Sequence, residues 1–329
     1  MRFFARRIGF YLVTVWAALT INFLIPRLMP GNPIQSLVSH YQGQGAEAAV
    51  ASLEKTFGLN AHEGLLGDYW NYLDQLAHGN LGLSITYYPS TVSSEISHSL
   101  PWTIGLVGVS TVISFVLGTM AGIYAGWRRG SRVSDTMVPV SMFLSSMPYF
   151  WIGLLALTAF GADLHWFPLA GGANPDLVAG WNGPFVSSVL THAALPAATI
   201  IVSSVGGWVL GMRNMTVTTM AEDYITVAVA KGLSQRRIMY QYAARNALLP
   251  NLSAFALSLG FVVSGAIVTE TLFSYPGIGF EMFNAVANDD YPLMQGIFLV
   301  ITLAVLVANL FADALYVALD PRIRQGVTS

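Results

Sequence analysis

Six stretches of this sequence are long and apolar enough to cross a lipid bilayer. A spanning helix needs about 20 mainly apolar residues, because the hydrocarbon layer is about 30 Å thick. Lipid cannot hydrogen-bond to the backbone, so each stretch must satisfy its own N–H and C=O groups as a helix. We therefore predict an all-α polytopic membrane protein with six transmembrane helices, at residues 8–28, 103–127, 137–162, 193–212, 252–272 and 293–317.

The composition excludes an ordinary soluble domain. Charged residues make up 10% of the chain and apolar residues 54%, whereas a globular protein is about 25% charged. The net charge of −2 gives no indication of a nucleic-acid partner. The chain has no cysteine, which excludes disulfides, thiolate metal sites and cysteine nucleophiles.

The N-terminus resembles a secretion signal, because Arg2, Arg6 and Arg7 precede an apolar run. The run is longer than a signal core, and no small-x-small cleavage site follows it. We therefore interpret it as a retained first span.

The fifteen lysines and arginines predict the orientation. With six spans, thirteen of them fall on the side that holds both termini, and only Arg27 and Lys55 fall on the other side. Basic residues accumulate on the cytoplasmic side of membrane proteins. We predict a bacterial or archaeal cytoplasmic (inner) membrane location with both termini cytoplasmic.

Most of the acidic residues fall on the outer side. All six histidines fall on the outer side or at its boundary. No histidine pair has the i, i+4 spacing of a helical metal motif. We interpret this as a solvated outer face and predict no metal site.

The cytoplasmic segment 213–250 between spans four and five is the most informative part of the chain. Thr219 to Glu222 has the pattern of a capping box, and Gly232 is placed to end a short helix. Ala221, Ile225 and Ala228 share one face at helical spacing. Ser234 is placed to cap a second helix that Pro250 would interrupt. This helix–turn–helix could seat in a groove on a partner or lie on the membrane surface, and the pattern by itself leaves both open.

Several motifs resemble one family of membrane proteins. The cytoplasmic segment contains Glu222-Asp223-Tyr224-Ile225, Ala228, Ala230-Lys231-Gly232-Leu233-Ser234, Arg236-Arg237 and Arg245-Asn246-Ala247-Leu248-Leu249-Pro250. It is similar to the "EAA" loop of ABC importer permeases, in the dipeptide/oligopeptide/nickel branch. Pro30-Gly31-Asn32-Pro33 and Leu319-Asp320-Pro321-Arg322-Ile323-Arg324 resemble further signatures of that branch, with Asn32 at an aspartate position. The long first outer segment resembles the first of its two permeases.

The resemblance implies a type I ABC importer-like permease, a non-catalytic subunit whose coupling helix docks into a cytoplasmic ATPase. The implied contact residues are Glu222, Asp223, Tyr224, Ala228, Ala230, Lys231 and Gly232, with Arg236 and Arg237 bordering them. The implied partners are a second homologous permease, two ATPase subunits or domains and an extracytoplasmic substrate-binding protein. No G-x-x-x-x-G-K-[ST] occurs, so this chain would bind no cofactor, and ATP and Mg would lie on partner subunits.

Two ionisable residues near span ends, Glu270 and Asp313, are candidates for the translocation pathway, because charge inside a membrane is costly and often functional. A proton-coupled secondary transporter would use such groups, so that class of protein stays an alternative. An intramembrane hydrolase would need a base beside its nucleophile, and no histidine lies within a predicted span.

The predicted organisation has four parts: a first span (1–30), an outer helical segment (31–99), a five-helix core (100–318) and a cytoplasmic tail (319–329). Residues 46–57 and 65–76 of the outer segment have helical patterns and suggest a small cap that receives the binding protein. The substrate stays open: peptides are the default of the branch, and oligosaccharides or metal complexes are alternatives.

Overall fold

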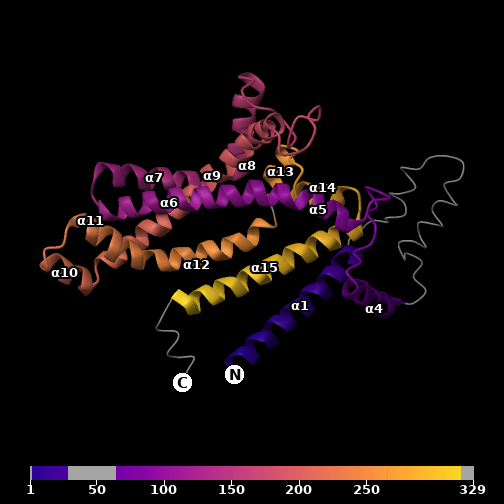
Figure 1. Ribbon diagram of the computed structural model, residues 1–329, viewed down its shortest axis with the longest axis horizontal. Coiled ribbons are helices and arrows are strands. Elements are labelled where there is room, and N and C mark those ends of the chain that lie inside the picture. The colour runs from indigo at the N-terminus through magenta and orange to yellow at the C-terminus, as the bar shows by residue number, and fades with distance from the viewer. Residues whose placement is uncertain (1, 29–63, 265, 320–329) are drawn as a thin grey trace, which may run out of the picture.

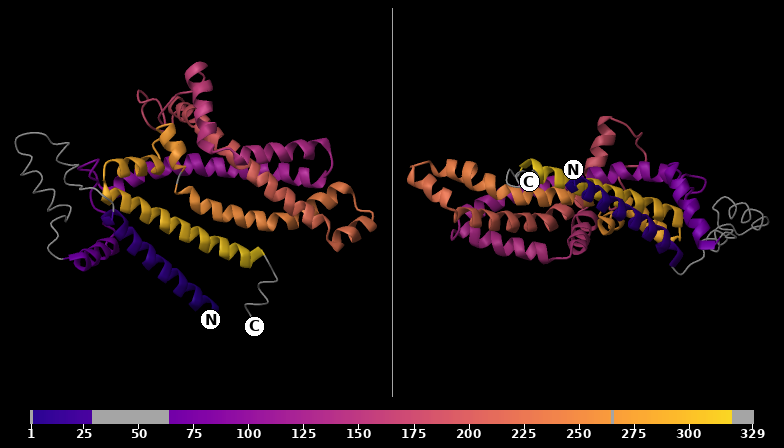
Figure 2. Two further views of the ribbon diagram at one scale, coloured as in Figure 1. Left: turned by 180° about the vertical axis from the view of Figure 1, so that it is seen from behind. Right: turned by 90° about the horizontal axis from the view of Figure 1, so that it is seen from below.

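The computed structural model describes residues 2–28, 64–264 and 266–319. Regular structure in these residues is helical, apart from one antiparallel bridge between Leu83 and Thr91. The long helices run side by side in an elongated bundle (Figures 1 and 2). α4 (Gly64–Ala77) lies at one end of the bundle and α10 (Asp223–Ala230) at the other, and we call these the α4 end and the α10 end. The fold is all-α, as predicted.

Three continuous helices in the described residues are long and apolar enough to cross a membrane, and a bent helix pair brings the number to four. The other two predicted spans correspond to α1, whose apolar part is Tyr11–Leu24, and to α12 together with α13.

Segments named η are π-helical. The bundle consists of α1 (Arg2–Leu28), the continuous helix of α5 (Val92–Thr103), η1 (Ile104–Gly108) and α6 (Val109–Trp127), α7 (Arg132–Ser146), α8 (Tyr149–Ala156) with η2 (Leu157–Asp163), α9 (Gly183–Met220), α12 (Arg245–Val262), α13 (Ile267–Leu272), α14 (Ile278–Ala287) and α15 (Tyr291–Leu319).

The third predicted span, 137–162, is not one helix. It is broken between α7 and α8, which meet at 91°. Proline has no backbone N–H and disfavours the helical conformation of the residue before it. Met147, which precedes Pro148, accordingly has an extended backbone (ψ 129°). As a result α8 projects sideways from the bundle (Figure 1).

The fifth predicted span, 252–272, is also divided, because α12 ends at Val262 and α13 begins at Ile267. The Ser264 hydroxyl donates to the Phe261 carbonyl (2.6 Å) and so satisfies a carbonyl at the end of α12.

Pro250, which we expected to interrupt a helix, lies inside α12. The helix continues from α11 (Gln235–Arg237) through η3 (Ile238–Ala244) to Val262. Membrane helices tolerate proline where local π adjustments re-satisfy the freed backbone groups.

Three glycines on α6 allow it to pack closely against α9. Gly118, Gly122 and Gly126 are four residues apart and face α9. A Cβ on Gly122 would lie 2.6 Å from the Val209 carbonyl oxygen and 2.7 Å from Met212 Cβ. Small residues at this spacing let two membrane helices approach until their backbones touch. This stripe positions α9 and therefore the segment that follows it.

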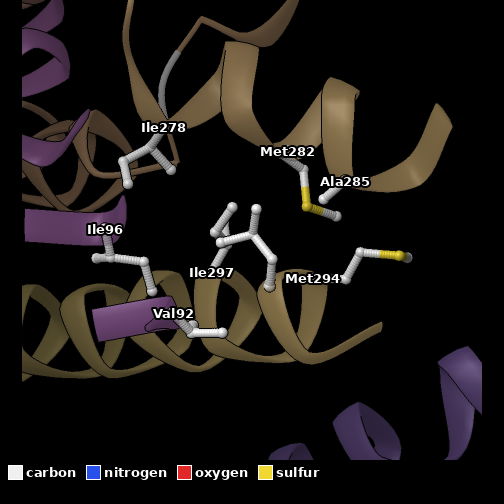
Figure 3. Close-up of a cluster of buried hydrophobic side chains, with 8 residues drawn as sticks. Val92, Ile96, Ile278, Met282, Ala285, Met294 and Ile297 are labelled. Carbon is white, nitrogen blue, oxygen red and sulfur yellow. The ribbon is translucent and has the colours of Figure 1, made fainter. Parts of the chain in front are cut away.

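At the α4 end, helices far apart in sequence share an apolar core. Val92 and Ile96 of α5 meet Met282 of α14 and Met294 and Ile297 of α15 (Figure 3). All of these side chains are buried. Asp290 joins the same region, because its buried carboxylate accepts from the Ser84 hydroxyl, the Thr86 N–H (2.9 Å) and the Leu293 N–H (3.1 Å).

The helix predicted at 65–76 is confirmed as α4, and it packs on α1. The Tyr69 hydroxyl is 2.8 Å from that of Thr20, and Asn22 donates to the Tyr72 hydroxyl (3.1 Å) and to the Gln295 carbonyl of α15 (2.8 Å). The second helical pattern, 46–57, lies outside the described residues.

Candidate functional site: a helical projection at the α10 end

α10 is a short helix that leaves the bundle at the end opposite α4 (Figure 1). The 38-residue α9 delivers the chain to this end and stops at Met220. The chain then forms α10, turns at Gly232 and returns as the long helix that begins with α11. The segment 213–250 is therefore mostly helix, and 221–234 is the part that projects.

The start of α10 differs from the predicted capping box. Thr219 still belongs to α9, so it cannot act as the N-cap. Glu222 occupies that position with an extended backbone (φ −77°, ψ 146°) and makes no side-chain cap hydrogen bond. Glu222 and Asp223 nevertheless place two carboxylates at the helix N-terminus, where the helix dipole favours negative charge.

The end of α10 is confirmed as a left-handed glycine turn. Gly232 has φ +70°. Its N–H donates to the Val229 carbonyl (2.9 Å), and the Leu233 N–H reaches back to the Ala228 carbonyl (3.3 Å). These two bonds form a Schellman motif, which satisfies carbonyls that the helix end would leave free. Ser234 then occupies the N-cap position of α11 as predicted, without a side-chain cap hydrogen bond.

One face of α10 packs against the returning helix. Ile225 and Ala228 are buried together with Ile238 and Ala243. Asn246 adds a polar contact at the start of α10, because its side-chain amide donates to the Tyr224 hydroxyl (2.9 Å). α10 is thus held on the returning helix along its apolar face and by a hydrogen bond, and it can move with that helix.

This packing corrects two predictions about the apolar face. Ala228, predicted as a contact residue for a partner, is only 2% exposed and has a structural role instead. Ala221, predicted on the same face as Ile225, is exposed because it precedes α10 as the C-cap of α9.

The surface of α10 outside this packed face is open. Val227, on the side away from Ile225 and Ala228, is 51% exposed, and Val229, which flanks the packed face, is 53% exposed. Apart from Ala228, the predicted contact residues are all exposed: Glu222, Asp223, Tyr224, Ala230, Lys231, Gly232, Arg236 and Arg237. Arg237 donates to Gln241 within its own helix (3.0 Å). The exposed surface combines an apolar centre with acids at one end and bases at the other, which suits docking rather than catalysis.

Glu270 occupies a closed position in the bundle. It is 0% exposed, and its carboxylate accepts from the Thr103 hydroxyl (3.0 Å) and from the Gly279 and Phe280 N–H groups (2.7 and 3.3 Å). Those amides belong to the first turn of α14, so Glu270 acts as a cap supplied from another helix. Its burial gives no support to the prediction that it lines the translocation pathway.

The side chain of Asp313 lies outside the described residues, so its predicted pathway role stays a prediction. In the described parts of the chain, no group of three or more His, Cys, Asp or Glu side chains could hold a metal ion.

Sequence reasoning missed the residues that hold α10 in place. Ile238, Ala243 and Asn246 lie on the returning helix, at spacings altered by the π-helical η3. A regular α-helical projection does not place them on one face, so periodicity gave no signal for them. The α6 glycine stripe does have a signal in the sequence, because its three glycines recur every four residues.

Two comparisons with known proteins agree with this geometry. Residues 118–325 match the family described as "Binding-protein-dependent transport system inner membrane component". The chain is 33% identical to the di/tripeptide transport system permease protein DppB of Pseudomonas aeruginosa, over 98% of this chain and 99% of the relative. It is 34% identical to the dipeptide transport system permease protein DppB of Alkalihalophilus pseudofirmus, over the same shares.

A third relative is the oligopeptide transport system permease protein OppB of Haemophilus influenzae, at 29% identity over 98% of this chain and 99% of the relative. The family match covers more than half of the chain and includes α10 and the returning helix. This chain belongs to the family of inner membrane permease components of binding-protein-dependent transport systems.

Proposed function

We propose that this chain forms half of the translocation pathway of an ATP-driven importer for peptides. The peptide assignment rests on the relatives, which are named for dipeptide, di/tripeptide and oligopeptide transport. No observation on this chain supports the oligosaccharide alternative. Family membership also disfavours a proton-coupled transporter, because a binding-protein-dependent system of this kind takes its energy from separate ATPase subunits.

In this proposal the chain crosses the membrane six times, with α1, α5–η1–α6, α7–α8–η2, α9, α12–α13 and α15 as the spans. The α10 end is cytoplasmic. The N-terminal end of α1 and the C-terminal end of α15 lie nearer the α10 end than the opposite ends of these helices do (Figure 2), consistent with the distribution of basic residues. A second permease completes the pathway, and a binding protein delivers the cargo at the α4 end.

α10 is the proposed coupling helix, and its attachment to the returning helix carries this assignment. An element that transmits movement must be rigidly fixed on one side and free on the other. Ile225 and Ala228 fix one side by burial, and the exposed Val227 and Ala230 leave the other side open. When two ATPase subunits close on ATP, a docked α10 would carry α12 with it, so that each nucleotide state favours one membrane conformation.

The natural absence of cysteine allows a direct test by cross-linking. Val227→Cys, on the side of α10 away from the packed face, should form a cross-link to the ATPase subunit with a short bifunctional reagent in membranes. Tyr240→Cys is a matched control, because Tyr240 is also exposed (61%) but lies on the returning helix rather than on α10. Equal cross-linking of both positions, or cross-linking of neither, would contradict docking by α10.

A further inference from the structure

One buried apolar cluster lies where the helices from the α4 end pass into the helices that lead to α10, and we call it the middle cluster. Its buried residues include Leu106, Val107, Leu195, Ile200, Val262 and Phe273. They come from η1, from α9, from the end of α12 and from the position after α13. The junction of α8 and η2 packs against the same cluster through Ala156 and Leu157.

Each of these passages of the chain is interrupted at the middle cluster. η1 is a π-helical segment between two α-helices, and η2 begins at Leu157. α9 contains Pro196 directly after Leu195, and α12 ends at Val262. π-Helical segments and internal prolines disturb the regular hydrogen-bond ladder, and they are the usual places where a helix bends. Because four interruptions meet in one cluster, the bundle can bend there.

The helices on the α4 side of the middle cluster are held together by polar contacts. Glu270 of α13 accepts from Thr103 at the end of α5 and from the first turn of α14. The Thr103 hydroxyl in turn accepts from the Ile278 N–H of α14 (2.7 Å). The apolar core in Figure 3 adds a second contact between α5 and α14. We call α5, α13 and α14 the α4 unit.

The helices on the other side form a second unit. The glycine stripe fixes α6 on the second half of α9, and the Asn251 amide of α12 donates to the Thr119 hydroxyl of α6 (3.0 Å). Trp127, the last residue of α6, packs on the cluster that holds α10. We call α6, the second half of α9, α10 and the returning helix with α12 the α10 unit. α15 joins the core in Figure 3 with residues 293–301 and packs along α12 beyond them.

The middle cluster itself offers little resistance to bending. Among the described residues, the side-chain hydrogen bonds that join different helices lie on either side of this cluster and not within it. Grooves of about 600 and 510 Å³ border η1 and leave room for movement. The buried hydroxyls of Ser110, Thr269 and Thr271 have no hydrogen-bond partner within the described structure. Unpaired buried groups raise the free energy of this arrangement and so narrow its gap to a second arrangement that would pair them.

We propose that the middle cluster is a hinge within this chain, about which the α10 unit tilts relative to the α4 unit. This inference rests on the proposed function, because the ATPase subunits drive the tilt through α10. The α4 unit stays in place under the binding protein while the α10 unit moves. The chain therefore changes its own shape during transport and does not turn as one rigid body.

Distances between paired spin labels in the assembled transporter measure this tilt. The chain is naturally free of cysteine, so labels can be attached to single cysteines that replace exposed residues, with partner subunits freed of cysteine. Ser97 and Phe283 are exposed positions on the α4 unit, and Met120 and Tyr240 are exposed positions on the α10 unit. The pair Phe283–Tyr240 crosses the middle cluster, whereas Ser97–Phe283 and Met120–Tyr240 each stay within one unit.

We expect the distance of the crossing pair to shift between the nucleotide-free and the vanadate-trapped transporter. The distances within each unit should stay the same, because polar contacts and close packing hold each unit together. If all three distances stay the same, the chain moves as one rigid body and the inference is wrong. A shift within either unit as large as that of the crossing pair would also overturn it.

Gly105→Ala and Gly207→Ala form a matched pair that tests the hinge by stiffening it. Both glycines are exposed, have helical neighbours and have no heavy atom within 4 Å of an added Cβ. Gly105 lies in η1, whereas Gly207 lies in the part of α9 that belongs to the α10 unit. Alanine favours the helical backbone more than glycine does, so the change resists bending without altering the packing.

Gly105→Ala should reduce the distance shift of the crossing pair and lower peptide uptake about two- to fivefold, with an equal or higher Tm. Gly207→Ala should leave the shift and uptake unchanged. Equal effects of the two variants on the shift would contradict a hinge at η1.

Uptake of Ala-Leu by proteoliposomes, measured in parallel, separates this inference from the proposed function. ATP-dependent uptake without a shift of the crossing pair would refute the hinge and leave the importer assignment intact. Absence of ATP-dependent uptake of any peptide would refute the assignment itself and, with it, a tilt driven through α10.

Discussion

Gly232 has a backbone conformation that other residues rarely adopt, and this single residue sets the turn after α10. At φ +70° an alanine would cost about 1–2 kcal/mol relative to glycine. Gly130, in the turn between α6 and α7, has φ +79° and is equally open, with no heavy atom within 4 Å of an added Cβ. An alanine would therefore be similarly strained at both positions, which differ in their place relative to α10.

We predict that Gly232→Ala and Gly130→Ala lower the Tm of the purified protein by similar amounts, because the same strain is introduced at both. Only Gly232→Ala should weaken the stimulation of ATPase activity by the loaded binding protein, since only that change re-aims α10. The measurement is a thermal melt paired with an ATPase assay. If both variants lose stimulation equally, the effect is general destabilisation and not coupling.

Glu281, on α14 at the α4 end, is a second residue with a measurable signature. Burial raises the pKa of its carboxyl group, the hydrogen bond with Tyr87 lowers it, and the charges of Glu95 and Asp290 raise it further. Its Oε2 atom is buried without a hydrogen-bond partner in the described structure. The folded state therefore holds this proton to a higher pH than the unfolded chain does.

The sign of the pH dependence follows from linkage. Between the unfolded and the folded pKa of Glu281, the folded state binds more protons, so the free energy of unfolding falls as pH rises through that window. We predict that Glu281→Gln raises the Tm at pH 7 and has no such benefit below about pH 4, where glutamate is protonated in both states. Asp176→Asn, at an exposed position, is the control. A Tm gain independent of pH would contradict this account.

The pairing of α6 with α9 decides how the projection is presented, because α9 leads directly into α10. The pairing depends on Gly122, where a Cβ would meet the Val209 carbonyl at 2.6 Å. Gly207 is a helical glycine of α9 with no heavy atom within 4 Å of an added Cβ. The two positions differ in packing and share helical conformation.

We predict that Gly122→Ala lowers stability by about 1–3 kcal/mol through overpacking. Gly207→Ala should be neutral or stabilise by up to about 1 kcal/mol, because alanine favours helix. Thermal unfolding in detergent measures both. A stable Gly122→Ala protein would show that α6 and α9 separate without cost.

The arrangement of the entire bundle makes a prediction about sidedness. The α10 end and the α4 end are opposite ends of one elongated structure (Figure 1). The exposed residues Arg129 and Lys231 belong to segments at the α10 end, and Asp74 and His78 follow or belong to α4. The six-span proposal requires that these two pairs be accessible from opposite sides of the membrane.

Single cysteines at these four positions, in the naturally cysteine-free chain, should report sidedness with a membrane-impermeant maleimide. Asp74→Cys and His78→Cys should react in intact cells stripped of outer barriers, whereas Arg129→Cys and Lys231→Cys should react only after the membrane is opened. Reaction of Lys231→Cys from outside would contradict a cytoplasmic α10.

The sequence was sufficient for the membrane class, the family and most helix positions, because these depend on local properties. Apolar length predicts spans, and the chemistry of glycine predicts the turn at Gly232. Pro148 was nevertheless a local signal for the break between α7 and α8. The prediction of a single span at 137–162 did not take it into account.

Tertiary structure decided what local patterns cannot contain. Ala228 and Ile225 are buried only because η3 places Ile238 and Ala243 opposite them, and Glu270 is a cap only because α14 begins beside it. Thr219 had every feature of an N-cap, yet α9 extends past it. Each of these outcomes depends on contacts between segments distant in sequence, whose free energy exceeds the fraction of a kcal/mol that local propensity contributes.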